Sequence, residues 1–115
     1  MDAPDPDLEK LILSPKELAK RLKAGDRLEL LDVRSDPEYQ VLHIEGSRLA
    51  TRKLVDELFS SWAKDTPIVL YDHFGSRGVD AAHVLTLRGF TAVRALRGGI
   101  DAWSQEVDPM VPRYP

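Results

Sequence analysis

Apolar runs and helical spacings of apolar residues alternate along this chain. The run Ile68-Val69-Leu70-Tyr71 is wholly apolar and follows Pro67, which predicts a buried strand. Between such runs, apolar residues recur three or four positions apart and predict helices. A further apolar run lies at 11–13, strands are predicted at 28–33 and 91–96, and a short candidate strand lies at 47–49. The predicted helices cover 14–24, 54–62, 76–88 and 100–105, and a further short helix is predicted to start at 36.

Turn and cap residues separate these elements. Ser14 followed by Pro15 and Glu17 predicts a helix start with a capping box, and Asp36 is predicted to cap the next helix. Gly25 and Gly89 follow helical patterns and predict their ends. Strands that alternate with helices through short connections predict an α/β fold, a mostly parallel sheet covered by helices on both faces.

The first nine residues differ in composition from the rest. Residues 1–9 carry two prolines and three aspartates, so we expect a flexible tail, with one domain over 10–115. This acidic start has no basic region and no apolar core, and it does not resemble a signal peptide. No apolar run approaches the roughly 20 residues of a membrane span, so we expect a cytoplasmic protein.

Composition narrows the chemistry. The net charge of −3 gives no reason to expect nucleic acid or an anionic membrane as a partner. The 115 residues include no cysteine, which excludes disulfides, thiolate metal sites and a cysteine nucleophile. His73 has no partner at metal-ligand spacing, so we expect neither a metal nor a cofactor.

Two polar segments follow predicted strands. Asp32-Val33-Arg34 comes after one strand, and residues 72–77 come after another. Ligands of parallel sheets bind beyond the carboxyl ends of the strands. The second segment joins a buried strand to a helix through a Gly-containing loop, which presents backbone N–H groups to whatever occupies its first position.

Taken together, these segments resemble the rhodanese-like domains of the thiosulfate sulfurtransferase superfamily. The resemblance runs in the family's order over roughly residues 9–106 and makes 10–115 a single rhodanese-like domain. Its last block, at 96–103, is the most specific. The matching stretches are Leu31-Asp32-Val33-Arg34, Glu38-Tyr39, His43-Ile44-Glu45-Gly46-Ser47, residues 68–77, Arg88-Gly89-Phe90, Val93 and Leu96-Arg97-Gly98-Gly99-Ile100-Asp101-Ala102-Trp103.

The resemblance implies a five-stranded, mostly parallel sheet and an active-site loop after the strand at 68–71. In active members a cysteine opens this loop and an arginine closes it five residues later, a spacing kept here by Asp72 and Arg77. Gly78 replaces the Ser or Thr that often follows the arginine. Upstream, Leu42 and Glu45 stand where glycine and proline are usual.

Asp72 changes the expected chemistry. Rhodanese chemistry stores sulfane sulfur as a persulfide on a thiolate, and a carboxylate can neither form nor pass on a persulfide. The active-site loop is therefore expected to be degenerate. The carboxylate of Asp72 either accepts the loop N–H groups as a built-in anion or is a neutral replacement, and the sequence leaves both open. The degenerate loop consists of Asp72, His73, Phe74, Gly75, Ser76 and Arg77.

Four residues are candidates for binding at the mouth of this loop. Arg34 either lines the mouth or forms a surface ion pair, and Arg77 either orients a ligand or pairs with a nearby acid. Phe74 either anchors a partner as an exposed aromatic or folds inward over the loop. Asp32 either joins the site or ties the loop ends through hydrogen bonds.

Three classes of function follow. The leading one is a binding or regulatory module, inactive as a sulfurtransferase, that takes an unknown protein or a small anionic ligand at the loop mouth. The second is an enzyme with altered chemistry, in which Asp72 accepts a phosphoryl group and Asp32 helps to hold Mg²⁺. The third is a structural role within an oligomer, whose state the sequence does not specify.

Overall fold

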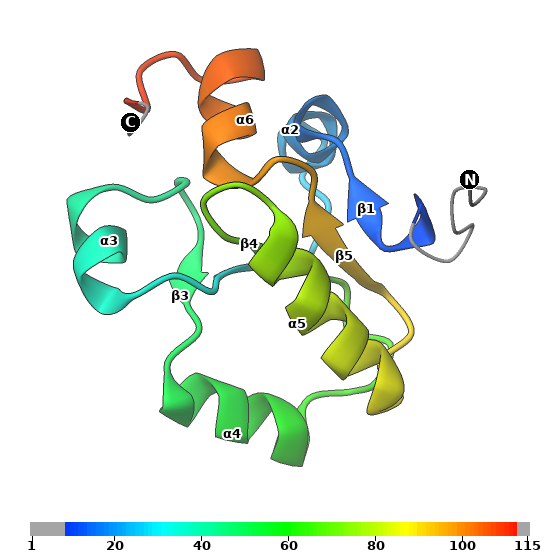
Figure 1. Ribbon diagram of the computed structural model, residues 1–115. Coiled ribbons are helices and arrows are strands. Elements are labelled where there is room, and N and C mark those ends of the chain that lie inside the picture. The colour runs from blue at the N-terminus through cyan, green and yellow to red at the C-terminus, as the bar shows by residue number, and fades with distance from the viewer. Residues whose placement is uncertain (1–8, 113–115) are drawn as a thin grey trace, which may run out of the picture.

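The computed structural model describes residues 9–112, and its centre is a five-stranded parallel sheet with strand order β1-β5-β4-β2-β3 (Figure 1). This confirms the predicted fold class. The buried strand predicted at 68–71 has those bounds and lies in the middle of the sheet. The strands are β1 (Ile12–Leu13), β2 (Glu29–Asp32), β3 (Arg48–Leu49), β4 (Ile68–Tyr71) and β5 (Val93–Leu96).

Helices cover both faces of the sheet because successive side chains of a strand point to opposite sides. In β4, Ile68 and Leu70 belong to one hydrophobic cluster, whereas Val69 and Tyr71 belong to another. The first cluster packs against α4 and α5, and the second packs against α2 and α6. The helices are α2 (Pro15–Lys23), α3 (Asp36–Val41), α4 (Arg52–Ser61), α5 (Ser76–Leu87) and α6 (Gly99–Glu106).

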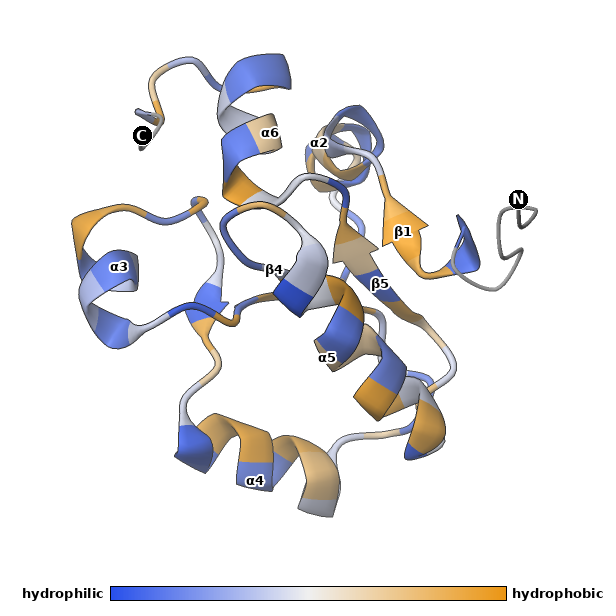
Figure 2. Ribbon diagram, in the orientation of Figure 1, coloured by the Kyte–Doolittle hydropathy of each residue, from blue (hydrophilic) through white to orange (hydrophobic). Residues whose placement is uncertain are grey.

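Hydrophobic and hydrophilic residues alternate along the surface helices at the spacing that the sequence indicates. Figure 2 shows this alternation along α4 and α5. In α4 the side chains of Leu54 and Leu58 are buried four residues apart, on the face that meets the sheet. No helix in the described part of the chain is both long and apolar enough to cross a bilayer.

The start of α3 corrects the prediction that Asp36 is its cap. Ser35 is the N-cap: its hydroxyl accepts a hydrogen bond from the Glu38 N–H, and the Glu38 side chain returns to the Ser35 N–H. Ser35 has the extended backbone that a cap requires, whereas Asp36 is already helical. At α2 the predicted cap is correct, since Ser14 accepts from the Glu17 N–H at 3.1 Å.

The structure describes only part of each end of the chain. Residues 1–8 of the predicted flexible tail lie outside the described residues, but Glu9 is helical. The described part of the stretch after α6, 107–112, turns back on itself. The Val111 N–H donates to the Asp108 carbonyl at 3.1 Å, which lets Val111 bury its side chain against α2 and α6.

Candidate functional site

The two polar segments lie side by side at the carboxyl edge of the sheet. Strands β2 and β4 are parallel neighbours, and Asp32 pairs in register with Tyr71. The residue after β2 continues this contact, because the Val33 N–H donates to the Tyr71 carbonyl at 2.9 Å. The residues that follow each strand, Arg34 and Asp72, therefore emerge together, as the strand-end argument predicts.

The carboxylate of Asp72 is held by its own loop. One oxygen, Oδ1, accepts the Gly75 N–H at 2.6 Å, and the other, Oδ2, accepts the Arg77 N–H at 2.8 Å. The side chain is buried. The expected hydrogen bonds between Asp72 and the loop N–H groups are thus present. A carboxylate occupies the position at the start of the loop, and both of its oxygens face donors of that loop.

The turn before α6 supports the same loop from the other side. The N–H groups of Ile100 and Asp101 donate to the carbonyls of Asp72 and His73, at 2.9 and 3.1 Å. Gly99 lies so close that a Cβ on it would come within 2.5 Å of both carbonyl oxygens. Only glycine allows this approach, which explains why α6 begins with Gly99.

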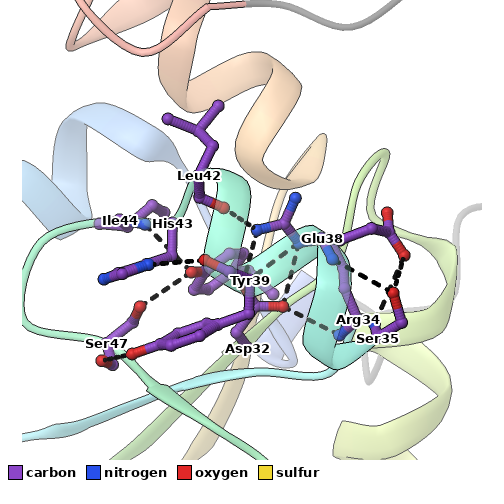
Figure 3. Close-up of polar contacts among 10 residues, drawn as sticks. Asp32, Arg34, Ser35, Glu38, Tyr39, Leu42, His43, Ile44 and Ser47 are labelled. Atoms are coloured by element: carbon purple, nitrogen blue, oxygen red, sulfur yellow. Dashed lines mark hydrogen bonds and ion pairs between the residues drawn. The ribbon is translucent and has the colours of Figure 1, made fainter.

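Asp32 and Arg34 form a buried ion pair beside the loop (Figure 3). The Arg34 Nη2 lies 2.8 Å from the Asp32 Oδ2, and Nε and the backbone N–H of Arg34 also donate to this carboxylate. Burial alone lowers the pKa of Arg34, but the hydrogen bonds and charge of Asp32 outweigh it and raise that pKa above its usual value. The ion pair of Arg34 is therefore buried and not at the surface. Asp32 ties the end of β2 to Arg34, which follows the strand.

Tyr71 makes a link that the sequence analysis missed. Its buried hydroxyl accepts the Ile44 N–H at 3.1 Å and shares a hydrogen bond with Ser47 at 2.9 Å. Burial raises the pKa of the Tyr71 phenol well above its ordinary value. A tyrosine at the end of a wholly buried strand needs a polar partner, and this was the available signal. The link fixes the 43–47 segment beside the strand end.

The segment that includes His43 is also held from α3. The His43 Nδ1 lies 2.8 Å from the Tyr39 carbonyl, the two rings stack, and the Tyr39 hydroxyl donates to the Ser47 carbonyl. Figure 3 shows these contacts together with those of Arg34. His43 thus holds the 43–47 segment against α3.

The loop tip lies over a small cavity of about 290 Å³. Phe74 points outward, with 62% of its surface exposed, and its ring stacks on His73 at 4.0 Å between centroids. Arg77 is exposed, and no ion pair of its side chain occurs among residues 9–112. The cavity brings together three of the four candidate binding residues. Its lining consists of Arg34, Glu38, Asp72, His73, Phe74, Ser76 and Arg77.

Glu38 belongs to this lining although the sequence marked it only as part of a motif. Its hydrogen bond with Ser35 lowers the pKa of its carboxyl below the ordinary value. Asp32, by contrast, lies behind Arg34 and does not line the cavity. Its contribution to the site is indirect, through the position of the Arg34 guanidinium.

Comparison with known proteins agrees with this fold. The model of the rhodanese-like domain family matches residues 14–106, and the chain belongs to that family. A solution structure of the rhodanese-like domain of the Anabaena protein Alr3790 is 31% identical, with a TM-score of 0.73 over 83% of this chain and 74% of that one. The human single-domain sulfurtransferase TSTD1 is 25% identical, with a TM-score of 0.71 over 84% and 96%.

Curated relatives include longer proteins. A probable adenylyltransferase/sulfurtransferase, MoeZ of Mycobacterium tuberculosis, is 33% identical over 89% of this chain, which spans only 26% of MoeZ. A sulfurtransferase of Allochromatium vinosum is 29% identical over 86% of this chain and 92% of its own length. The names of these relatives describe those proteins, and the residues at the loop decide what this chain can do.

Proposed function

We propose that this chain is a rhodanese-like domain that does not transfer sulfur and that acts as a binding or regulatory module through the cavity beside residues 72–77. The observation that carries the proposal is the position of Asp72. Its carboxylate fills the start of the loop and accepts the Gly75 and Arg77 N–H groups. A cytoplasmic location is part of the same proposal.

Sulfur transfer needs a group that this chain lacks. In the family's reaction a thiolate attacks the outer sulfur of thiosulfate, sulfite leaves, and the resulting persulfide passes its outer sulfur to cyanide as thiocyanate. The 115 residues contain no cysteine. A carboxylate oxygen cannot take the thiolate's place, because it forms no stable bond to sulfane sulfur that a second acceptor can then cleave.

The alternative of a phosphoryl acceptor at Asp72 has no comparable support. Each oxygen of this carboxylate accepts a backbone N–H group and the side chain is buried, which disfavours attack on an incoming phosphate. The acid suggested for Mg²⁺, Asp32, is paired with Arg34 instead. We therefore do not adopt this alternative.

The test measures thiocyanate formed from thiosulfate and cyanide by the wild type and by Asp72→Cys. We expect no turnover by the wild type. Turnover by the variant would support an intact loop in which only the nucleophile is missing. Turnover by the wild type would contradict the proposal. To separate a binding role from a purely structural one, the cellular function should be assayed with the variants Phe74→Ala and Arg77→Ala. If the role is structural, both variants should keep the function. If the role is binding, both should lose it.

A further inference from the structure

One buried donor of the site lacks an acceptor. The Nε and Nη2 groups of Arg34 donate to Asp32, and Nη2 also donates to the Leu42 carbonyl. The remaining nitrogen, Nη1, is the only buried side-chain nitrogen or oxygen atom without a hydrogen-bond partner among the described residues. Figure 3 shows that no dashed line reaches this nitrogen. Buried donors in native proteins are nearly always paired, so this one is satisfied either by a water or by an acceptor from another molecule.

The cavity that Arg34 helps to line has room for such a group. Its volume of about 290 Å³ is several times the roughly 30 Å³ that one water occupies in the liquid, and it lies near the lower end of ligand-pocket sizes. Nη1 itself makes essentially no contact with solvent in this conformation. For an acceptor to reach it, side chains of the cavity lining have to move.

The charges around the cavity disfavour an anion. Arg34 and Arg77 are balanced by Glu38 and Asp72 in the lining, and Asp32 adds a further negative charge directly behind Arg34. The loop N–H groups that would otherwise attract an anion are occupied by the Asp72 carboxylate. An uncharged acceptor is not repelled by these carboxylates. A carbonyl oxygen is the common uncharged acceptor in proteins.

Beside the donor lies an apolar surface. The Phe74 ring is 62% exposed and stacks nearly parallel on His73, with 17° between the ring planes. Exposed aromatic rings at the rim of a cavity are typical anchors of protein partners. The site therefore offers a donor for a carbonyl and a flat surface for an apolar side chain, a combination that a peptide satisfies.

We propose that the cavity binds an uncharged peptide segment of a partner protein. One carbonyl of this segment, from its backbone or from an Asn or Gln side chain, accepts a hydrogen bond from Arg34 Nη1. An apolar side chain of the segment packs on the His73–Phe74 rings. This inference rests on the proposed function and specifies its partner as a neutral peptide and not as a small anion.

The test uses a library of random 12-residue peptides displayed on phage and selected on the full chain, followed by calorimetry with the selected peptides in synthetic form. We expect peptides without net charge that carry a large apolar residue. Their Kd should rise about tenfold or more in Phe74→Ala, a loss typical of an anchor residue. Leu87→Ala is the matched control, because Leu87 is even more exposed but lies at the far end of α5, and it should leave the Kd unchanged.

Two further measurements distinguish a peptide carbonyl from an anion. The side-chain N–H signals of arginines in NMR spectra of the wild type should shift at Arg34 on addition of peptide and not on addition of sulfate or acetate. Binding should change little up to ~0.5 M salt, since screening weakens interactions between charges. Acidic peptides with salt-sensitive binding, or equal binding by Phe74→Ala, would overturn the inference.

Failure to select any peptide would also overturn it. That result is separable from a failure of the proposed function, which is decided by the thiocyanate assay. A wild type that is silent in the assay and binds no peptide would leave the module without this class of partner. A wild type that forms thiocyanate would remove the proposed function itself.

Discussion

The carboxylate of Asp72 and the backbone N–H of Arg77 lie 2.8 Å apart across the loop that opens α5. The same carboxylate accepts the Gly75 N–H, so an acid of the chain occupies the donors at the start of this helix. The loop thereby gains a permanent internal anion. Its conformation is held without any ligand, because the hydrogen bonds that order it come from its own first residue.

Replacing Asp72 by alanine should destabilise the fold and open the loop to anions. Hydrogen bonds to charged groups contribute about 1.5–3 kcal/mol each, so the loss of both bonds in Asp72→Ala should lower the free energy of unfolding by about 3–6 kcal/mol in urea denaturation. Sulfate should then raise the Tm of the variant more than that of the wild type. Asp65→Ala, at an exposed position, serves as the control and should change stability little. Equal effects of sulfate on wild type and variant would contradict the role given to Asp72.

The buried pair of Asp32 and Arg34 should be far more sensitive than an exposed pair of similar length. Asp32→Asn leaves a buried guanidinium without its counter-charge and should cost about 3–5 kcal/mol. Glu29→Gln breaks the exposed pair with Arg48, whose N–O distance is 2.7 Å, and should cost less than about 1 kcal/mol. Chemical denaturation of the two variants measures the difference. Similar losses would mean that burial does not govern the strength of these pairs.

Gly99 and Gly46 provide a matched test of the contact between the α6 turn and the loop. Both have a positive φ, of 62° and 86°, but only Gly99 has neighbours within reach of a Cβ. Gly46→Ala should cost about 1–2 kcal/mol from backbone strain alone. Gly99→Ala adds a collision with the carbonyls of Asp72 and His73 and should cost clearly more. It should also abolish any activity that Asp72→Cys acquires, whereas Gly46→Ala should preserve it.

The Glu38 carboxyl should make stability depend on pH in the acid range. Its pKa in the folded state is lowered below the ordinary 4.5, mainly by the Ser35 hydroxyl. The stabilisation is therefore fully present above the unfolded-state pKa and is lost as the pH falls through the folded-state value. Wild type should exceed Glu38→Gln in stability at neutral pH, and the difference should disappear as the pH falls through the folded-state pKa of Glu38.

Repeating the comparison of Glu38 and Glu38→Gln in a Ser35→Ala protein checks the cause of this pH dependence. In Ser35→Ala, the cap hydroxyl that stabilises the ionised carboxylate is absent. The difference between Glu38 and its Gln variant should then shrink at neutral pH, as a double-mutant cycle measures. An unchanged difference would assign the effect to another neighbour, such as Arg34.

The sequence by itself determined the elements that depend on local pattern. The strand at 68–71 was predicted at its observed bounds, because four consecutive apolar residues after a proline have no other stable place than the sheet interior. The short edge strand β3 and the ends of β2 and β5 were predicted less accurately, since neighbouring strands decide where pairing stops. Ser35 and Asp36 are both good caps, and only the backbone conformation chose between them.

For the site, the sequence determined the nature and spacing of Asp72 and Arg77, and with them the absence of a thiol at the loop. Tertiary structure decided which groups meet there. Tyr71 contacts Ile44 and Ser47 across more than 20 residues of chain, and Gly99 packs against the loop carbonyls from a different helix. Such contacts arise only when the parallel strands bring their carboxyl ends to one edge of the sheet. For the same reason, the unpaired nitrogen of Arg34 and the cavity beside it could not be foreseen from residue types alone.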